Sequence, residues 1–184
     1  MVGDAGSLVV RHDDNGVSTL TLNRPRARNA LSLSMIDAFL EHVEAIAEDV
    51  SIRVVVLAGA GPAFCAGHDL KELKDNPDPK ATQTLFSRCS DMMMHLVRLP
   101  QPVIAKVHGV ATAAGCQLVA AADLAVAGKS ATFATPGVNI GLFCTTPSVA
   151  VSRTISRKKA MEMLLTGEPV TAAAAEAMGL INSA

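Results

Sequence analysis

The feature that most constrains the fold is an order of elements that occurs twice: a strand-like run, a loop containing glycine, and a helix. The first copy starts with IRVVVLAGA at residue 52 and continues into GPAFCAGHDLKEL. The second starts with VIAKV at residue 103 and continues into HGVATAAGCQL, with a helix starting near Ala113. Strands that alternate with helices predict an α/β architecture, in which ligands bind where loops leave the strand ends.

The flanking patterns complete one domain over residues 1–184. They predict, in order, a hairpin at 8–22 that turns at Asn15-Gly16, a helix capped by Ser32 that runs to about Ala47, a surface loop at 75–80, a helix at 81–99 and a strand from Leu124. The run from Ile52 is a short apolar, β-branched run that ends at glycine, which is consistent with a strand buried on both faces. The methionines at 92–94 follow the helical spacing and are interpreted as core filling.

Charge and composition exclude several function classes. The 16 basic and 17 acidic residues give a net charge of -1, which offers no footprint for nucleic acid or an anionic membrane. No signal peptide and no apolar run long enough for a membrane span is visible, so a soluble, cytoplasmic protein is expected. The four cysteines lack the spacing of a zinc site, so no metal is expected and the thiols are predicted to be reduced and mostly buried.

The two glycine loops are candidates for a binding site. Gly67 is interpreted either as a tight turn with positive φ or as a point where backbone approaches a ligand. The second loop ends at a helix N-terminus, where unpaired N–H groups and the helix dipole favour an oxygen that carries negative charge. Together the loops can supply two converging donors for an enolate or oxyanion.

Five segments in register resemble the enoyl-CoA hydratase/isomerase, or crotonase, superfamily over nearly the whole chain. They are NRPRARNALS, GPAFCAGHDLKEL, PVIAKVHGVATAAGCQLVAAADLAVA, FATPGVNIGL and MLLTGEPVTAAAAEAMGLI. The residues of these motifs are most similar to those of the enoyl-CoA hydratase domain-containing subgroup. The resemblance implies a crotonase-like spiral of repeated β-β-α units, with the C-terminal helical region absent or truncated after GLINSA. It also implies a homotrimer or dimer of trimers that binds an acyl-CoA thioester in an extended cleft, with coenzyme A as part of the substrate and no permanently bound cofactor.

The resemblance assigns roles residue by residue. The oxyanion hole for the thioester carbonyl would be the backbone N–H groups of His68 and Ala114. The carbonyls of Ala66 and Leu70 would accept from the adenine amino group. The remaining expected contacts with substrate or coenzyme A are Arg26 and Arg28 near the phosphates, and Asp69, Gly115, Pro136 and Leu142. Both arginines could instead belong to a solvated charged turn.

The usual catalytic pair is substituted. Hydratases of this family use two glutamates, and their positions fall on Gln117 and Gly137. Gln117 cannot accept a proton at neutral pH and Gly137 has no side chain, while each such acid–base group is typically worth a factor of ~10²–10⁴. Little hydratase activity is therefore expected.

No other residue is an evident substitute for the glutamates. Cys144 as a nucleophile would need a base, and none is evident. His108 is expected to support a turn and Asp123 to be structural. Solvent or a lysine such as Lys71 would satisfy Asp69 and Glu72.

The resulting hypothesis is an acyl-CoA-processing enzyme that stabilises the enolate of a thioester, with hydration of a 2-enoyl-CoA as the default reaction. A non-catalytic acyl-CoA-binding protein is the first alternative, because both carboxylates are missing. A CoA-thioester isomerase or thioesterase that uses water or an unrecognised residue is the second.

Overall fold

The computed structural model describes residues 6–184 and begins with the predicted hairpin. Strands β1 (Val9–Asp14) and β2 (Val17–Leu22) pair antiparallel. Asn15 and Gly16 between them have φ of 50° and 82°, as a type I′ turn requires. The local turn chemistry therefore determines how the first sheet starts.

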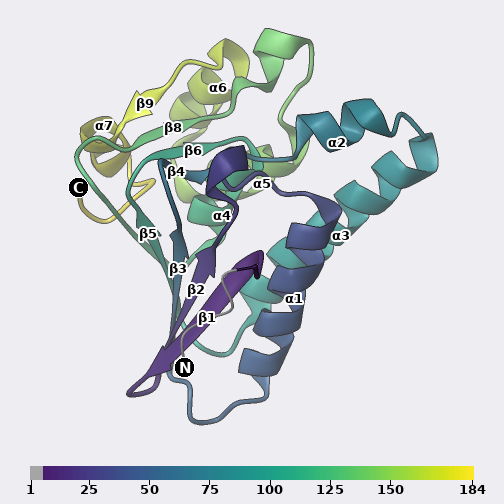
Figure 1. The fold of residues 1–184 in the computed structure, drawn as a ribbon. Helices are drawn as coiled ribbons and strands as arrows, with labels where there is room; N and C mark the ends of the chain where they lie inside the picture. Colours follow the sequence, from purple (N-terminus) through teal and green to yellow (C-terminus); the bar gives the residue numbers. More distant parts are fainter. Residues whose placement is uncertain (1–5) are drawn as a thin grey trace.

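The first sheet has five strands in the order β1-β2-β3-β5-β7. Strands β3 (Val54–Gly59), β5 (Val103–Val107) and β7 (Leu124–Ala127) all run parallel to β2. In β3, buried residues alternate with partly exposed ones. The expectation that this strand is buried on both faces is therefore wrong, because among the described residues helices cover one face of the sheet and the apolar run continues onto the other face (Figure 1).

The second sheet has four short strands in the order β4-β6-β8-β9. They are β4 (Ala63–Cys65), β6 (Val110–Thr112), β8 (Thr132–Ala134) and β9 (Val170–Thr171), and the first three are parallel. Each pair β3-β4, β5-β6 and β7-β8 gives one strand to each sheet before the chain turns into helix. This arrangement is the expected spiral of repeated β-β-α units.

Helices α1 (Leu33–Ala47) and α3 (Pro79–Arg98) pack beside each other against one face of the first sheet (Figure 1). The Ser32 side chain accepts a hydrogen bond from the Met35 N–H at 3.2 Å, so the predicted cap is confirmed. Of the three consecutive methionines, Met92 and Met93 are buried, whereas Met94 is 43% exposed. The prediction that these methionines fill the core is therefore confirmed for Met92 and Met93 and wrong for Met94.

The other helices surround the second sheet or lead into it. They are α2 (Leu70–Asp75), α4 (Ala114–Ala121), α5 (Thr145–Thr154), α6 (Arg157–Thr166) and α7 (Ala172–Ala177), with short 3-10 helices η1 (Pro25–Ala27) and η2 (Pro136–Ile140). Helix α4 begins where predicted and packs against β4, β5, β6 and α5, which places it at the centre of the molecule. Across residues 6–184, no helix is both long enough and apolar enough to cross a membrane.

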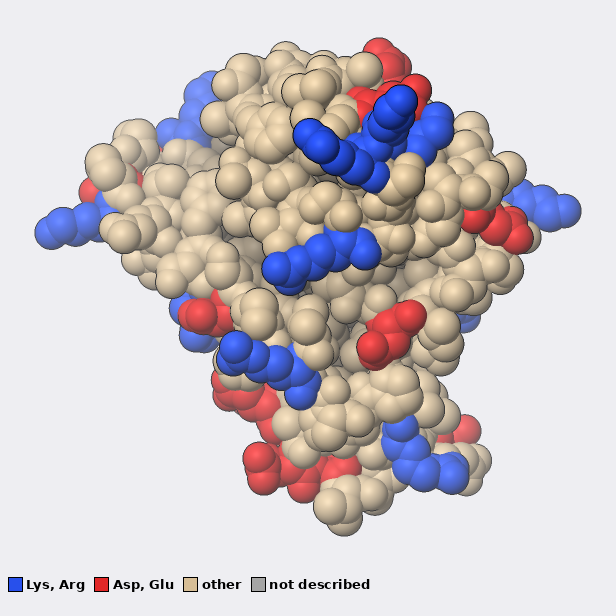
Figure 2. Space-filling view, turned by 180° about the vertical axis from the view of Figure 1, so that it is seen from behind, with Lys and Arg blue, Asp and Glu red and all other residues tan. Residues whose placement is uncertain are grey.

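The face of the molecule seen in Figure 2 carries both signs of charge. Some Lys and Arg side chains gather near the top beside Asp and Glu side chains, and others are spread over the face with uncharged surface between them. This distribution agrees with the nearly balanced charge of the sequence.

Candidate functional site

The two glycine loops lie side by side at the carboxyl ends of neighbouring parallel strands. β4 pairs with β6 through Cys65 and Ala111, so the loops that follow them leave the same edge of the second sheet. The Thr112 hydroxyl donates to the Ala66 carbonyl at 3.0 Å and joins the loops directly. A Cβ added at Gly67 would lie 2.9 Å from the Thr112 carbonyl oxygen, and the φ of Gly67 is 89°. The turn with positive φ is therefore confirmed, and the missing side chain lets the backbone of Thr112 come close, whereas approach of this loop to a ligand stays a prediction.

The backbone N–H groups of His68 and Ala114 at this edge are among those without an acceptor in the described part of the chain. On either side of His68, the Leu31 N–H donates to the Gly67 carbonyl at 2.8 Å and the Asp69 N–H donates to the Leu31 carbonyl at 3.1 Å. Ala114 is the first residue of α4. Within residues 6–184, neither the N–H of His68 nor that of Ala114 donates to a protein acceptor. Because a Cβ on Gly67 would come within 3.2 Å of the Ala114 nitrogen, the loops that carry these donors are adjacent.

Ala113 has a strained backbone directly before the second donor. Its φ of 51° and ψ of -119° are unusual for a residue with a side chain, and such conformations cost ~1–3 kcal/mol. Two hydrogen bonds hold it: its N–H donates to the Ala134 carbonyl at 2.9 Å, and its carbonyl accepts from the Gln117 N–H at 3.0 Å. This conformation sets the direction of the Ala114 N–H. No pattern in the surrounding alanine-rich sequence predicts this backbone conformation.

The His68 imidazole packs against Phe86 of α3, with ring centroids 4.6 Å apart. Its Nε2 is buried and has no partner in the described chain. Burial away from water lowers the pKa of His68 to about 4. The ring is therefore neutral at physiological pH.

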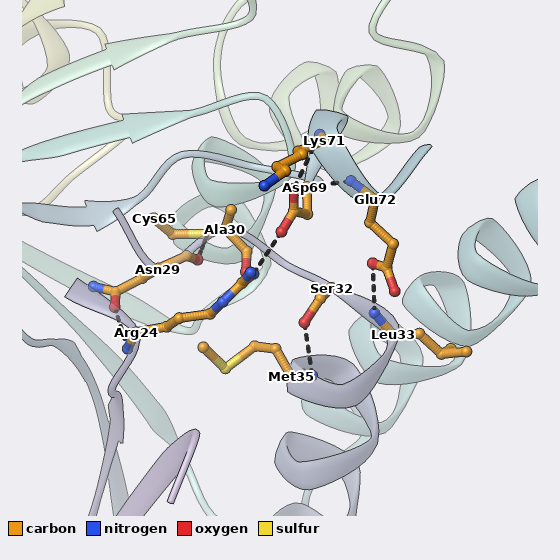
Figure 3. Close-up of polar contacts among 10 residues, drawn as sticks. All are labelled: Arg24, Asn29, Ala30, Ser32, Leu33, Met35, Cys65, Asp69, Lys71 and Glu72. Atoms are coloured by element: carbon orange, nitrogen blue, oxygen red, sulfur yellow. Dashed lines mark hydrogen bonds and ion pairs between the residues drawn. The ribbon is translucent and has the colours of Figure 1, made fainter. Parts of the chain in front are cut away.

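Asp69 is occupied by structural contacts (Figure 3). Its carboxylate accepts from Arg24 Nη1 at 2.6 Å, and it caps α2 by accepting from the N–H groups of Lys71 at 3.0 Å and Glu72 at 3.2 Å. Burial opposes ionisation, but these hydrogen bonds hold the pKa of Asp69 below its ordinary value. Glu72 in turn accepts from the Leu33 N–H at 3.0 Å. The expectation that solvent or the Lys71 side chain satisfies these acids is wrong, because backbone donors and Arg24 fold within reach.

Asn29 fixes the arginine-rich turn beside the first loop. Its fully buried side chain accepts from the Arg24 N–H at 2.8 Å and donates to the carbonyls of Ala60, Ala63 and Phe64 at 2.9, 2.8 and 3.1 Å. The Ala66 N–H donates to the Arg28 carbonyl at 3.0 Å. The exposed Arg26 and Arg28 are therefore on a turn that is bonded to the first glycine loop. The contributions of Arg24 and Asn29 were missed, because pairing over a long sequence separation leaves no local pattern.

Gln117 and Gly137 occupy different surroundings. Gln117 is 7% exposed and its Oε1 has no partner among residues 6–184. Gly137 does not have positive φ, but a Cβ there would lie 2.6 Å from the Leu142 carbonyl oxygen and 2.8 Å from Cys144 Sγ. Neighbouring atoms of the loop at 142–144 therefore fill the space that a larger side chain at position 137 would need.

The remaining predicted site residues are placed as follows. Gly115 lies so close to the Cys65 carbonyl that any side chain would overlap it. Pro136 is half-buried at the start of η2, and the side chains of Leu142 and of Leu70, the first residue of α2, are exposed.

Three residues were considered as substitutes for the missing glutamates, and the surroundings of each are structural. Burial raises the pKa of the Cys144 thiol, although a hydrogen bond from the Gly137 N–H acts in the other direction. His108 Nε2 lies 2.7 Å from the Gly61 carbonyl, and Asp123 accepts from the Val103 N–H at 2.8 Å, as expected for structural residues.

All four cysteines are free and buried, as predicted. The described part of the chain contains no group of three or more His, Cys, Asp or Glu side chains that could hold a metal ion.

Comparison with known families and proteins gives consistent matches. Residues 12–184 match the family profile described as enoyl-CoA hydratase/isomerase. The chain is 49% identical over 183 residues to the enoyl-CoA hydratase domain-containing protein 3, mitochondrial, of Danio rerio, which covers 100% of this chain and 63% of that protein. The Homo sapiens protein of the same name is 46% identical over 168 residues, which cover 91% of this chain and 55% of that protein. The chain thus spans less than two thirds of the length of these curated relatives.

Two solved structures have closely similar folds. The enoyl-CoA hydratase of Mycobacterium smegmatis superposes with a TM-score of 0.94 and 57% identity, over 96% of this chain and 69% of that chain. The human enoyl-CoA hydratase domain-containing protein 3 superposes with a TM-score of 0.93 and 44% identity, over 96% of this chain and 70% of that chain.

Proposed function

Because this chain belongs to the enoyl-CoA hydratase/isomerase family, we propose that it binds a coenzyme A thioester at the carboxyl ends of β4 and β6. The thioester carbonyl oxygen accepts hydrogen bonds from the N–H groups of His68 and Ala114. These donors stabilise the negative charge that develops on the oxygen when an enolate forms. The observation that carries this proposal is that these two backbone donors lie on adjacent loops and have no acceptor among residues 6–184.

Coenzyme A extends from the thioester toward the arginine-rich turn. The Ala66 carbonyl accepts from the adenine amino group with its second lone pair, since the first is used by Thr112. The Leu70 carbonyl is the other proposed acceptor. Arg26 and Arg28 are exposed, which leaves both guanidinium groups free to approach the phosphates.

The other proposed contacts have different roles. Gly115 permits close approach of backbone, and Pro136 and Leu142 contact the acyl side of the ligand. Asp69 acts as a positioning residue, because its carboxylate is engaged by Arg24 and the start of α2.

The proposed reaction class is acyl-CoA processing through a stabilised enolate, with hydration of a 2-enoyl-CoA as its default form. A second candidate is a protein that holds acyl-CoA without turnover. It is favoured by Gln117, which cannot take up a proton at neutral pH, and by the filled space at Gly137. An isomerase or thioesterase would need a group that moves a proton, and Cys144 has no evident base beside it.

Calorimetric titration with butyryl-CoA and with S-butyl-CoA, a thioether without the carbonyl, tests the site. We expect the thioester to bind more tightly, because only its oxygen can accept from the two N–H groups. Equal affinities would contradict the oxyanion hole. Turnover measured against a panel of CoA thioesters then separates an enzyme from a binding protein.

The assembly and the compartment stay predictions. A homotrimer or dimer of trimers is proposed from the family alone, and light scattering that gives only a monomer would reject it for this chain. A cytoplasmic location is not supported by the curated relatives, whose names carry the word mitochondrial.

A further inference from the structure

We infer that Ala113 controls how strongly the oxyanion hole favours a thioester, through strain in the peptide that carries the Ala114 N–H. The inference rests on the proposed function and names a positioning residue of the same site. Ala113 acts through the orientation of the N–H that follows it, and not through contact with the reacting atoms.

The backbone of Ala113 has a conformation that suits glycine. Its φ of 51° and ψ of -119° are those of the first central position of a type II′ turn, where glycine is favoured. The other non-glycine residues with positive φ in the described chain are Asn15, Arg28 and Asn29. Asparagine tolerates positive φ, and Arg28, with ψ of 37°, is in the left-handed region. Ala113 lies outside that region and is strained, whereas glycine would not be.

A less strained conformation is open to Ala113 through a change of ψ alone. The left-handed region has φ near about +57° and ψ near about +47°, so a rotation of ψ by roughly 165° brings Ala113 into it. This rotation turns over the peptide between Ala113 and Ala114. The Ala114 N–H then points away from the hole, and the Ala113 carbonyl takes its direction.

One hydrogen bond opposes this rotation. The Ala113 carbonyl accepts from the Gln117 N–H at 3.0 Å, and this is the one bond that the peptide makes within residues 6–184, since the Ala114 N–H has no acceptor there. The bond from the Ala113 N–H to the Ala134 carbonyl belongs to the preceding peptide and is kept in both orientations. The strain at Ala113 and a single hydrogen bond are free energies of the same order, so both orientations are accessible.

The donor on the first loop is held more firmly. Gly67 has a φ of 89°, which glycine adopts without strain. The Gly67 carbonyl accepts from the Leu31 N–H at 2.8 Å, and the Asp69 N–H donates to the Leu31 carbonyl at 3.1 Å. Two bonds to one residue therefore flank the His68 N–H, and the orientation of the Ala114 N–H is the variable one of the two.

A thioester oxygen selects one of the two orientations. It can accept from the Ala114 N–H, whereas the turned Ala113 carbonyl would place one oxygen against another. A Cβ on Gly67 would lie 2.9 Å from the Ala113 methyl carbon and 3.2 Å from the Ala114 nitrogen, so the first loop leaves little room for the second to move aside instead. The apparent affinity for the thioester is therefore reduced by the fraction of molecules in the competent orientation.

The test is calorimetric titration of Ala113→Gly and Ala113→Asn with butyryl-CoA and with S-butyl-CoA. Glycine removes the strain, so the ratio of the two affinities should rise at least about threefold through tighter binding of the thioester. Asparagine favours the left-handed region, so its ratio should fall below that of the unmodified chain. The affinity for S-butyl-CoA, which has no carbonyl oxygen, should change less than about twofold in either variant. A purely structural role would change stability but not the ratio.

Asn15→Gly is the matched control, because Asn15 also has positive φ but lies in the hairpin turn outside the site. It should leave the ratio unchanged. Ala113→Gly should fold, because its backbone conformation suits glycine. A thioester preference of the unmodified chain that stays the same or falls in Ala113→Gly, or that rises in Ala113→Asn, would overturn the inference and leave the proposed function standing. No preference in either the unmodified chain or Ala113→Gly would overturn both.

Discussion

Installing carboxylates at positions 117 and 137 should produce hydratase activity. If only the acid–base pair is missing, the unmodified chain hydrates crotonyl-CoA orders of magnitude more slowly than a family member that has both glutamates. Each carboxylate is worth a factor of ~10²–10⁴, and the two act on one water and one proton as a unit. Gln117→Glu with Gly137→Glu should therefore restore far more activity than either change alone.

The structure sets the cost of each substitution. At position 137 the backbone is not strained, but the new Cβ would be 2.6 Å from the Leu142 carbonyl and 2.8 Å from Cys144 Sγ. Overpacking of this kind typically costs ~1–3 kcal/mol. Cys144→Ala removes one of the two overlaps, so we expect the triple variant to be more stable than the double variant. At position 117, burial would raise the pKa of a glutamate, while the N-terminus of α4 would favour its charged form by ~0.3–1 kcal/mol.

The assay follows the loss of enoyl absorbance of crotonyl-CoA, with thermal unfolding of each variant measured in parallel. We expect the triple variant to hydrate crotonyl-CoA fastest and the double variant next. Both single variants should have rates close to that of the unmodified chain. Gln101→Glu is the control for adding a carboxylate at a buried glutamine elsewhere, and it should restore nothing. Fast hydration by the unmodified chain would refute the reasoning and make Cys144 or His108 the first candidates for the chemistry.

Three further predictions concern single residues. Because burial lowers the pKa of His68 to about 4, against 6.5 in the unfolded chain, the unfolded state takes up the proton first as the pH falls. Stability should therefore decrease between pH 6.5 and 4, by up to ~3 kcal/mol, and urea unfolding of His68→Phe should show a smaller decrease; equal pH dependence would contradict the burial of this ring. Asp69→Ala removes a helix cap and an ion pair with Arg24 and should destabilise the chain by ~2–4 kcal/mol, whereas Asp69→Asn, which can still cap α2, should lose less; thermal or urea unfolding measures both. Ala114→Pro removes one oxyanion donor at the first position of α4, where proline is tolerated, and should cost any measured turnover ~2.7–4 kcal/mol in transition-state stabilisation; unchanged turnover in a folded variant would argue against this donor.

Much of the architecture could be predicted from the sequence, because local signals act over a few residues. Asn15-Gly16 specified the first turn, Ser32 specified the start of α1, and apolar spacing located α3. Gly67 and the stretch of small, uncharged residues around Ala114 indicated the two loops that the fold brings together. The strands of the second sheet were implied by the family resemblance but not located from the residue pattern, because strands of three residues, such as β4 and β6, are too short to show alternation.

Tertiary structure alone decided the contacts that join distant segments. Arg24 and Asp69 are 45 positions apart, and Asn29 reaches the carbonyl of Phe64, so no local pattern could pair them. The strain at Ala113 likewise depends on a hydrogen bond to Ala134 of another strand. The sequence identified Gln117 and Gly137 as departures from the family, but only packing revealed that Cys144 fills the space beside Gly137 and that Gln117 is buried without a partner. The sequence specifies the type of each side chain, whereas the space and the hydrogen-bond partners available to that side chain depend on which strands become neighbours.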